Sequence, residues 1–230
     1  MSGKYCLHAM GEDPRAMAEW FGRNFGFAVS ERDGAYIAQD GALTMVFRIG
    51  KGSPSRYGIR HVALNAVDIE AALAACREKG LDLDTDNGKC YHNACVWGTG
   101  TDFFNIYTPF DFGLEICQRL DVRQGDPARN IAGLEHVGVF VEDIDAAEAF
   151  YKSMGFRHAY PRTPIDKGAA TVLCSMMTDG DLMLEVFAVK GNPPEMEKTF
   201  PGLESVSLLR DSAAGFIGPD GDRFEFATSL

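Results

Sequence analysis

The sequence contains one phrase twice. The segments GIRHVALNAVDIEAALAAC (58–76) and GLEHVGVFVEDIDAAEAFY (133–151) both read Gly-x-x-His-Val, then an apolar run, then Asp-Ile-acid-Ala-Ala. Their histidines, His61 and His136, lie 75 residues apart (136 − 61). A repeat of this kind is typical of a supersecondary unit used more than once, so it constrains the fold more than any single motif does.

Each copy predicts a strand followed by a helix. Apolar and other residues alternate through each run, so that the histidine faces away from the apolar side. Asp68 and Asp143 then stand at N-cap positions before apolar residues at helical spacing. The glycines at Gly80 and Gly155 end the two helices.

Two weaker blocks extend the pattern to four. In the first block a helix begins at Asp13-Pro14 and ends at Gly26. The last block has a strand at 203–209, a turn at 218–223 and a closing strand at 224–227, with no room for a full helix. The sequence therefore predicts an α+β fold of four βαβββ-type modules, the last one truncated.

The blocks are not four equal copies. The first and third helices share an aromatic-rich end, EWFGRNFGF and AFYKSMGF, whereas the second ends AALAACREKG. This alternation indicates a tandem duplication of a two-module unit, covering 1–121 and 130–230, and the polar linker RQGDPARN separates the two. We expect mixed sheets that curl into cup-shaped cavities.

The composition limits the partners. The chain has 33 acidic and 22 basic residues, a net charge of −11. Such a surface repels phosphate backbones and anionic lipid, so we expect no nucleic-acid and no membrane partner.

No apolar run reaches the roughly 20 residues of a spanning helix, and the start, MSGKYCLHAM, does not read as an export signal. With six cysteines and no C-x-x-C pair, we expect reduced thiols in a cytoplasmic protein. Cys90 and Cys95 flank His92, a weak zinc signal without a second cluster.

A glutamate follows each repeated histidine near the end of its block. Glu115 lies in FGLEICQ, 54 residues after His61, and Glu185 lies in LMLEVFAV, 49 residues after His136. A single histidine or glutamate on a strand is more often structural than functional. Two matched pairs facing one another would instead suit a divalent transition metal, namely Zn, Ni, Co, Mn or Fe.

At these motifs the chain resembles the vicinal oxygen chelate superfamily, which includes glyoxalase I, methylmalonyl-CoA epimerase, extradiol dioxygenases and bleomycin or fosfomycin resistance proteins. The resemblance rests on HVALNAVDIEAALAACREKGLDL, HVGVFVEDIDAAEAFYKSMGF and IGPDGDRFEFA, and it covers nearly the whole chain. It implies one metal ion held by His61, Glu115, His136 and Glu185. It also implies that the second module pairs with the third and the first with the fourth.

The first and fourth modules depart from the family pattern. Cys6 stands at the histidine position of the first block, with His8 two residues on, and Val46 stands near its glutamate position. The fourth block has Ser205 in place of histidine but keeps Glu225. We expect a degenerate second site. If neighbouring modules paired instead, one cup would hold His8 (or Cys6), His61 and Glu115, a set suited to a dioxygenase iron, and the other His136, Glu185 and Glu225.

The resemblance implies a metal-dependent lyase or isomerase of glyoxalase or epimerase type. Such an enzyme stabilises the enolate or enediolate of a small oxygen-bearing substrate, with Glu185 or Glu115 as the base and Glu185 preferred. Two alternatives stay open: an extradiol-type ring-cleaving dioxygenase, and a metal-free small-molecule binding or resistance protein.

The aromatic segment VWGTGTDFFNIY offers residues for a pocket wall. Trp97, Phe103, Phe104 and Tyr107 are the candidates, although aromatic residues in such runs more often belong to a core. The oligomeric state stays open, because four modules complete both cups within one chain and a homodimer is equally compatible.

Overall fold

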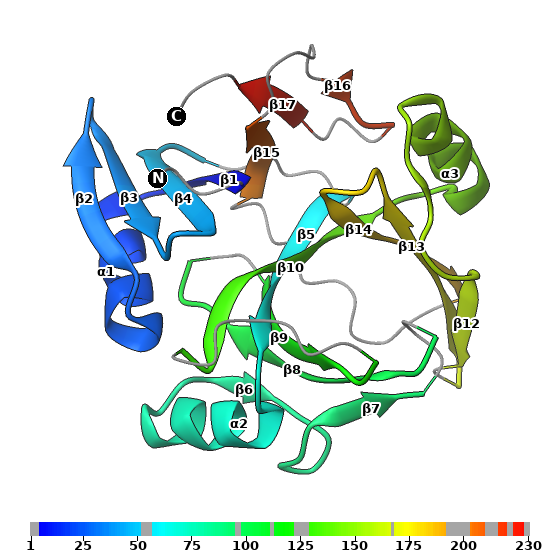
Figure 1. The fold of residues 1–230 in the computed structure, drawn as a ribbon, viewed down its shortest axis with the longest axis horizontal. Helices are drawn as coiled ribbons and strands as arrows, with labels where there is room; N and C mark the ends of the chain where they lie inside the picture. The colour runs from blue at the N-terminus through cyan, green and yellow to red at the C-terminus, as the bar shows by residue number, and fades with distance from the viewer. Residues whose placement is uncertain are drawn as a thin grey trace.

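The computed structural model describes residues 5–51, 57–94, 98–110, 113–121, 129–166, 168–191, 203–209, 216–219 and 223–227. In 203–209, 216–217 and 223–227 only the backbone is described. These residues form three helices and two sheets, one of seven and one of ten strands (Figure 1). The α+β architecture of curled mixed sheets is the one that the repeats predicted. None of the three helices is long and apolar enough to cross a membrane.

The helices begin where the sequence places their caps. They are α1 (Pro14–Phe25), α2 (Ile69–Glu78) and α3 (Ile144–Ser153). An aspartate precedes each one and accepts a hydrogen bond from a backbone N–H in the first turn, for example Asp68 from Ala71 at 3.0 Å. Gly26 ends α1 with φ of 71°, a left-handed conformation that glycine adopts without strain.

The seven-stranded sheet joins the first and fourth modules. Its strands are β1 (Tyr5–Gly11), β2 (Ala28–Arg32), β3 (Ala35–Gln39), β4 (Leu43–Ile49), β15 (Leu203–Leu209), β16 (Phe216–Ile217) and β17 (Arg223–Ala227). Their order is β16-β17-β15-β1-β4-β3-β2. β1 and β15 pair antiparallel and so connect the two ends of the chain.

The ten-stranded sheet joins the second and third modules. Its strands are β5 (Gly58–Ala66), β6 (Leu83–Asp84), β7 (Tyr91–Asn93), β8 (Thr101–Tyr107), β9 (Gly113–Arg119), β10 (Ile131–Phe140), β11 (Arg157–His158), β12 (Thr163–Asp166), β13 (Ala170–Thr178) and β14 (Met183–Gly191). The main order is β11-β13-β14-β10-β5-β9-β8-β6, while β12 pairs with β13 and β7 with β8.

The pairing of modules follows the interleaved scheme. β5 and β10 lie antiparallel at the centre of the ten-stranded sheet, and β1 and β15 do the same in the other sheet. The predicted pairing of second with third and first with fourth is therefore confirmed, and pairing between chain neighbours is wrong. Each sheet takes strands from both 1–121 and 130–230.

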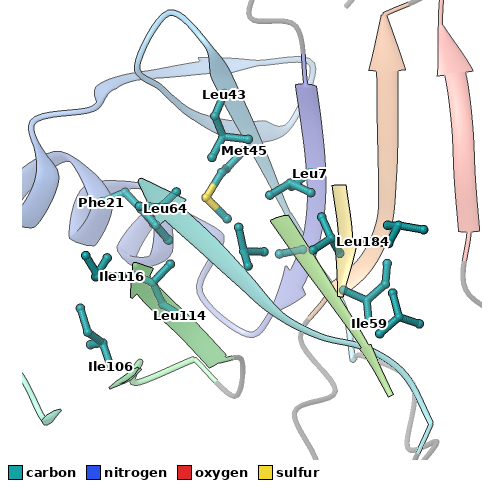
Figure 2. Close-up of a cluster of buried hydrophobic side chains, with 14 of the residues drawn as sticks. Leu7, Phe21, Leu43, Met45, Ile59, Leu64, Ile106, Leu114, Ile116 and Leu184 are labelled. Carbon is teal, nitrogen blue, oxygen red and sulfur yellow. The ribbon is translucent and has the colours of Figure 1, made fainter. Parts of the chain in front are cut away.

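A continuous apolar core joins the two sheets. Leu7 and Met45 of β1 and β4 belong to the same cluster as Leu64 and Leu114 of β5 and β9, and all four are fully buried (Figure 2). Because side chains alternate along a strand, the neighbours of these residues lie on the opposite faces of the sheets. Val62 and Val137, which follow the repeated histidines, also belong to this core, so the histidines lie on the inner face of the curled sheet.

Candidate metal centre

The four predicted ligands lie in two adjacent rows across the ten-stranded sheet. In each row a residue without a bulky side chain separates a histidine of one module from a glutamate of the other. The rows are Glu115–Ala63–His136 and His61–Gly138–Glu185. The arrangement is a near two-fold repeat about the β5–β10 contact, so each module contributes a ligand to both rows.

The side chains of these residues converge. His61 Nε2 lies 3.0 Å from His136 Nε2 and 3.1 Å from Glu185 Oε2. His136 Nε2 lies 3.6 Å from Glu185 Oε2 and 3.7 Å from Glu115 Oε1. One donor atom each from His61, Glu115 and His136 fall within 4.8 Å of one another. The sequence-predicted set is therefore brought together in space.

The four residues differ in their access to solvent. The side chain of His136 is 3% exposed and that of Glu115 is 12% exposed. His61 and Glu185 are 17% and 20% exposed. His136 thus lies deepest in the group, and a molecule that approaches from solvent meets Glu185 and His61 first.

Gly138 makes room for the His61 ring. A Cβ atom at this position would lie 2.0 to 2.4 Å from three atoms of the imidazole, which is much closer than van der Waals contact allows. The ring of His61 also stacks on Phe187 at a centroid distance of 6.0 Å. Gly138, the second residue after His136, is therefore required at this place because any larger residue would overlap the His61 ring.

Sequence reasoning missed Glu135, which lies beside His136 in the chain. Neighbouring strand residues normally point to opposite faces, but β10 has a bulge here: Leu134 pairs with Leu64 and His136 with Ala63. The bulge lets Glu135 Oε2 accept a hydrogen bond from His136 Nδ1 at 2.5 Å, with both side chains buried. The signal was a charged residue at a position where strand alternation predicts an apolar one.

Two buried cysteines complete the surroundings. Cys117 interacts with His136, and the Cys174 thiol lies 3.3 Å from Glu185 Oε1. Burial raises the pKa of both thiols well above its usual value. They are thus neutral groups that fill space and hydrogen-bond beside the ligands.

The charged groups of the site shift one another's pKa. Burial raises the pKa of Glu115, against the opposing effect of His136 and His61. Burial would also raise the pKa of Glu185, but the imidazoles of His136 and His61 beside it hold that pKa well below its usual value. For His136, burial alone would lower the pKa, but hydrogen bonds to Cys117 and Glu135 and the nearby carboxylates of Glu185 and Glu115 raise it well above normal.

The donor set fits a divalent transition metal. Zinc–nitrogen bonds of about 2.1 Å in a tetrahedron place ligand atoms roughly 3.4 Å apart, and the separations here run from 3.0 to 3.7 Å. Three carboxylates, of Glu115, Glu135 and Glu185, surround two imidazoles in a largely buried space. In the state that binds a metal, with the carboxylates ionised and the imidazoles neutral, this negative charge is costly unless a cation balances it.

The matching rows of the seven-stranded sheet carry other residues. They are Val46–His8–Ser205 and Thr44–Cys6–Ser207–Glu225. Cys6 and Val46 occupy the places of His61 and Glu115, and they pack with Ala35 into a small apolar cluster. The described side chains of this sheet thus form no ligand set like that of its sister.

His8 and Glu225, the predicted remnants of a second site, are placed as follows. His8 Nδ1 lies 3.1 Å from Arg48 Nη1, and its Nε2 lies 3.5 Å from the Cys6 sulfur. It belongs to a different sheet from His61, so it does not join the centre formed by His61 and Glu115. Glu225 holds the register position of Glu185, and its side chain is outside the described residues.

The predicted pocket residues separate onto two faces of β8. Tyr107 and Phe103 pair with Gly113 and Cys117, so they share the face of Glu115. Phe104 was expected to line the pocket, but it is fully buried in the core. The reason is alternation: in a Phe-Phe pair only one ring can face the site. Trp97 lies outside the described residues.

The weak zinc signal of Cys90, His92 and Cys95 finds no support in the described residues. His92 Nδ1 lies 2.6 Å from Asp102 Oδ1, an ordinary surface pair across β7 and β8. Cys90 is half-buried and belongs to no donor group within the described part of the chain, and Cys95 lies outside that part.

Comparison with solved structures identifies the fold. Glyoxalase I from Zea mays superposes with a TM-score of 0.60 at 13% identity, covering 96% of this chain and 90% of that one. A point mutant of the same maize enzyme gives a TM-score of 0.61 at 14% identity over 97% and 93%. A Bacillus subtilis protein described as a candidate dioxygenase gives 0.59 at 11% over 98% and 84%. No family model and no curated protein matches the sequence. The chain has the vicinal oxygen chelate fold.

Proposed function

We propose that this chain is a metal-dependent lyase or isomerase of glyoxalase or epimerase type. One observation carries the proposal: His61, Glu115, His136 and Glu185 come from four strands and both halves of the chain, yet four pairs of their nitrogen and oxygen atoms lie 3.0 to 3.7 Å apart. They would hold one divalent ion, of Zn, Ni, Co, Mn or Fe. The fold of glyoxalase I supports this function without identifying the reaction.

The bound ion would act as a Lewis acid that stabilises negative charge on a substrate oxygen. The chain's own residues would move the proton. A carboxylate beside the substrate accepts a proton from the carbon next to a carbonyl, which leaves an enolate or enediolate, and returns it to the neighbouring carbon or to the other face. General base catalysis of this kind contributes on the order of 10²–10⁴-fold.

Glu185 is the better placed base. It is the more exposed of the two carboxylates, at 20% against 12% for Glu115, so a substrate reaches it first. The raised pKa of Glu115 favours the opposite assignment, since a base works best with a pKa near the working pH. We give accessibility the greater weight because the base must touch the reacting carbon.

The first test is metal content and proton exchange. Chelator-treated protein is titrated with Zn, Ni, Co, Mn and Fe, and the bound ion is counted by atomic emission. The loaded protein is then incubated in D₂O with small α-hydroxycarbonyl compounds and α-branched thioesters, and the loss of C–H signal is followed by NMR. We expect one ion per chain and exchange with at least one compound. Failure of every ion to bind would remove the proposal.

A dioxygenase is the second candidate, in a revised form. The version that joins His8 to His61 is excluded because the two lie in different sheets. The donor atoms of His61, Glu115 and His136 nevertheless form a two-histidine, one-carboxylate group, the set found at non-haem iron centres. Oxygen consumption by the Fe(II)-loaded protein with a catechol, in the absence of C–H exchange, would select this function.

A metal-free binding protein is the outcome if no ion binds. Tyr107 and Phe103 would then contribute to a ligand surface on the face of Glu115. Ligand binding without turnover, preserved in Glu115→Gln and His136→Ala, would identify it.

A further inference from the structure

The two histidines of the centre differ in what lies behind them. Both turn Nε2 toward the shared space, where these atoms are 3.0 Å apart. His136 donates its other ring nitrogen, Nδ1, to Glu135 Oε2 at 2.5 Å. In the part of the chain that the structure describes, Nδ1 of His61 makes no such hydrogen bond.

The difference originates in one position of the repeat. The residue before the histidine is Arg60 in the second module and Glu135 in the third, and both are buried, at 8% and 7% exposure. Both also sit at irregular points of the β5–β10 ladder: Glu135 is the additional residue of β10, and Arg60 is the additional residue of β5. The Arg60 guanidinium lies over the Phe140 ring at 5.9 Å, and a guanidinium has no acceptor for a hydrogen bond from His61 Nδ1.

A carboxylate behind a metal-binding histidine has a defined physical effect. By accepting the Nδ1 proton it selects one tautomer and leaves the Nε2 lone pair free for the ion. It also holds the plane of the ring. At Glu135 both effects are strengthened by burial, because the side chain is 2% exposed and the surrounding backbone is paired in the sheet.

We infer that Glu135 is the positioning residue of the centre: its hydrogen bond to Nδ1 makes His136 the fixed ligand, whereas His61 is held only from its Nε2 side and by packing. This inference rests on the proposed function, since it assumes that an ion binds between the histidines. It adds a residue that neither the repeat nor the ligand pattern indicated.

One competing arrangement uses the same atoms. Donor atoms of Cys117, Glu135 and His136 also lie within 4.8 Å of one another, which would allow a second ion on the Nδ1 side. Glu135 would then be a ligand itself. The two arrangements differ in stoichiometry, because positioning requires one ion per chain and ligation requires two.

The test compares matched positions of the repeat. Glu135→Leu removes the acceptor, Glu135→Gln keeps an amide oxygen in its place, and Arg60→Leu is the control in the other module. Affinity for Zn or Co is measured by competition with a chromophoric chelator. We expect Glu135→Leu to weaken binding about 10–100-fold, Glu135→Gln to weaken it less, and Arg60→Leu to leave it nearly unchanged.

Two further measurements separate positioning from a structural role. Long-range ¹H–¹⁵N spectra of the zinc-loaded protein, assigned with His136→Gln, report the Nδ1–H of His136 while the ion would occupy Nε2. We expect a strongly downfield Nδ1–H signal in the natural protein, and an upfield shift or loss by solvent exchange in Glu135→Leu. Chemical denaturation should show Glu135→Leu to be no less stable than Glu135→Gln, since an apolar residue is well tolerated in a buried site.

The outcomes are distinct. Equal metal affinity in the natural protein and Glu135→Leu would overturn the inference and leave the proposed function intact. Binding of two ions, with one lost in Glu135→Leu, would also overturn it. Loss of affinity that follows loss of stability across the variants would make the role structural. If the natural protein binds no ion, both the inference and the proposed function fail.

Discussion

The two sheets of this molecule have the same strand plan and opposite chemistry. In the ten-stranded sheet the rows through the central strand pair present two histidines and two glutamates. In the seven-stranded sheet the same register positions of β1 and β4 present Cys6 and Val46, which pack with Ala35. Backbone pairing therefore fixes where ligands would stand, and only the side chains decide whether a centre exists.

The difference shows which features belong to the scaffold. Both sheets have alternating inward and outward side chains, an aspartate cap before each helix, and an antiparallel pair formed by the first strands of two modules. Among the described side chains of the strands, the buried acids and Gly138 beneath His61 occur in the ten-stranded sheet, at the candidate metal site. The bulge is shared by both sheets, because β15 has an additional residue at Glu204 as β10 has at Glu135. The buried acids are unfavourable for stability alone, since a buried charge requires compensation.

The largest expected effect is on the rate of C–H exchange, and it should distinguish Glu185 from Glu225, which holds the same register position in the other sheet. Glu185→Gln should lower C–H exchange on the order of 10²–10⁴-fold, because it removes the proposed base. Glu225→Gln, at the matching place of the other sheet, should leave exchange unchanged. NMR exchange rates in D₂O measure both. If Glu115→Gln lowers the rate more than Glu185→Gln at equal metal content, the base is Glu115.

Removing a ligand should affect one sheet alone. We expect His136→Ala to weaken metal binding by about 100-fold or more, beyond the 10–100-fold typical for partners behind a ligand. His8→Ala should not change the number of ions bound, since both nitrogens of His8 contact Arg48 and Cys6. Competition titration and ion counting measure these effects. A drop in stoichiometry in His8→Ala would reveal a second site.

A methyl group at Gly138 should disturb one histidine. In Gly138→Ala the new Cβ overlaps the His61 ring, which must swing away. Overpacking costs about 1–3 kcal/mol, so metal affinity should fall by up to about 100-fold. Ala63 is the counterpart in the other module and already carries this methyl group beside His136. Unchanged affinity in Gly138→Ala would mean that the His61 ring has another position from which it binds.

The smallest expected effect concerns acid stability, and it also distinguishes the modules. Glu148 on α3 is buried and accepts hydrogen bonds from Arg162 at 2.8 Å, whereas α1 and α2 have Ala18 and Leu73 at this place. Burial alone would raise its pKa, but the hydrogen bond from Arg162 and the charges of His158 and Arg162 lower it to about 2.

Because the pKa of Glu148 is lower in the folded protein, its contribution is present above the unfolded pKa and is lost on acidification. We expect about 2 kcal/mol of stability to disappear between roughly pH 4.5 and pH 2, after allowance for the exposure of its partners. Urea denaturation across this range should show the slope in the natural protein and a smaller slope in Glu148→Leu. An equal slope in both would assign the acid sensitivity to other carboxylates.

Much of the fold follows from local sequence signals. Aspartates at 13, 68 and 143 predict the helix starts because an N-cap acts within a few residues. Counting back seven residues from each cap places Cys6, His61 and His136 at one position of the repeat. The helix starts and these strand positions are confirmed because they need only local caps, strand alternation and the repeat.

The misses share a different cause. Glu135 reaches His136 only because β10 has a bulge. Its charge at an apolar position indicated a departure from alternation, but the shift of the ladder depends on the partner strand. Phe104 faces the core and Phe103 the site because of the phase of β8, which the aromatic run alone leaves open. Features that depend on how one strand registers against another need the partner strand to be known.

The pairing of β1 with β15 also has a consequence for synthesis on the ribosome. Tyr5 pairs with Leu208, a separation of 203 residues (208 − 5). β1 therefore leaves the exit tunnel long before the strand with which it pairs, and such long-range pairing slows folding. Meanwhile one edge of β1 is open to other chains. The ten-stranded sheet, which is proposed to bind the ion, consists of strands between residues 58 and 191. It can therefore assemble before β1 and β15 pair.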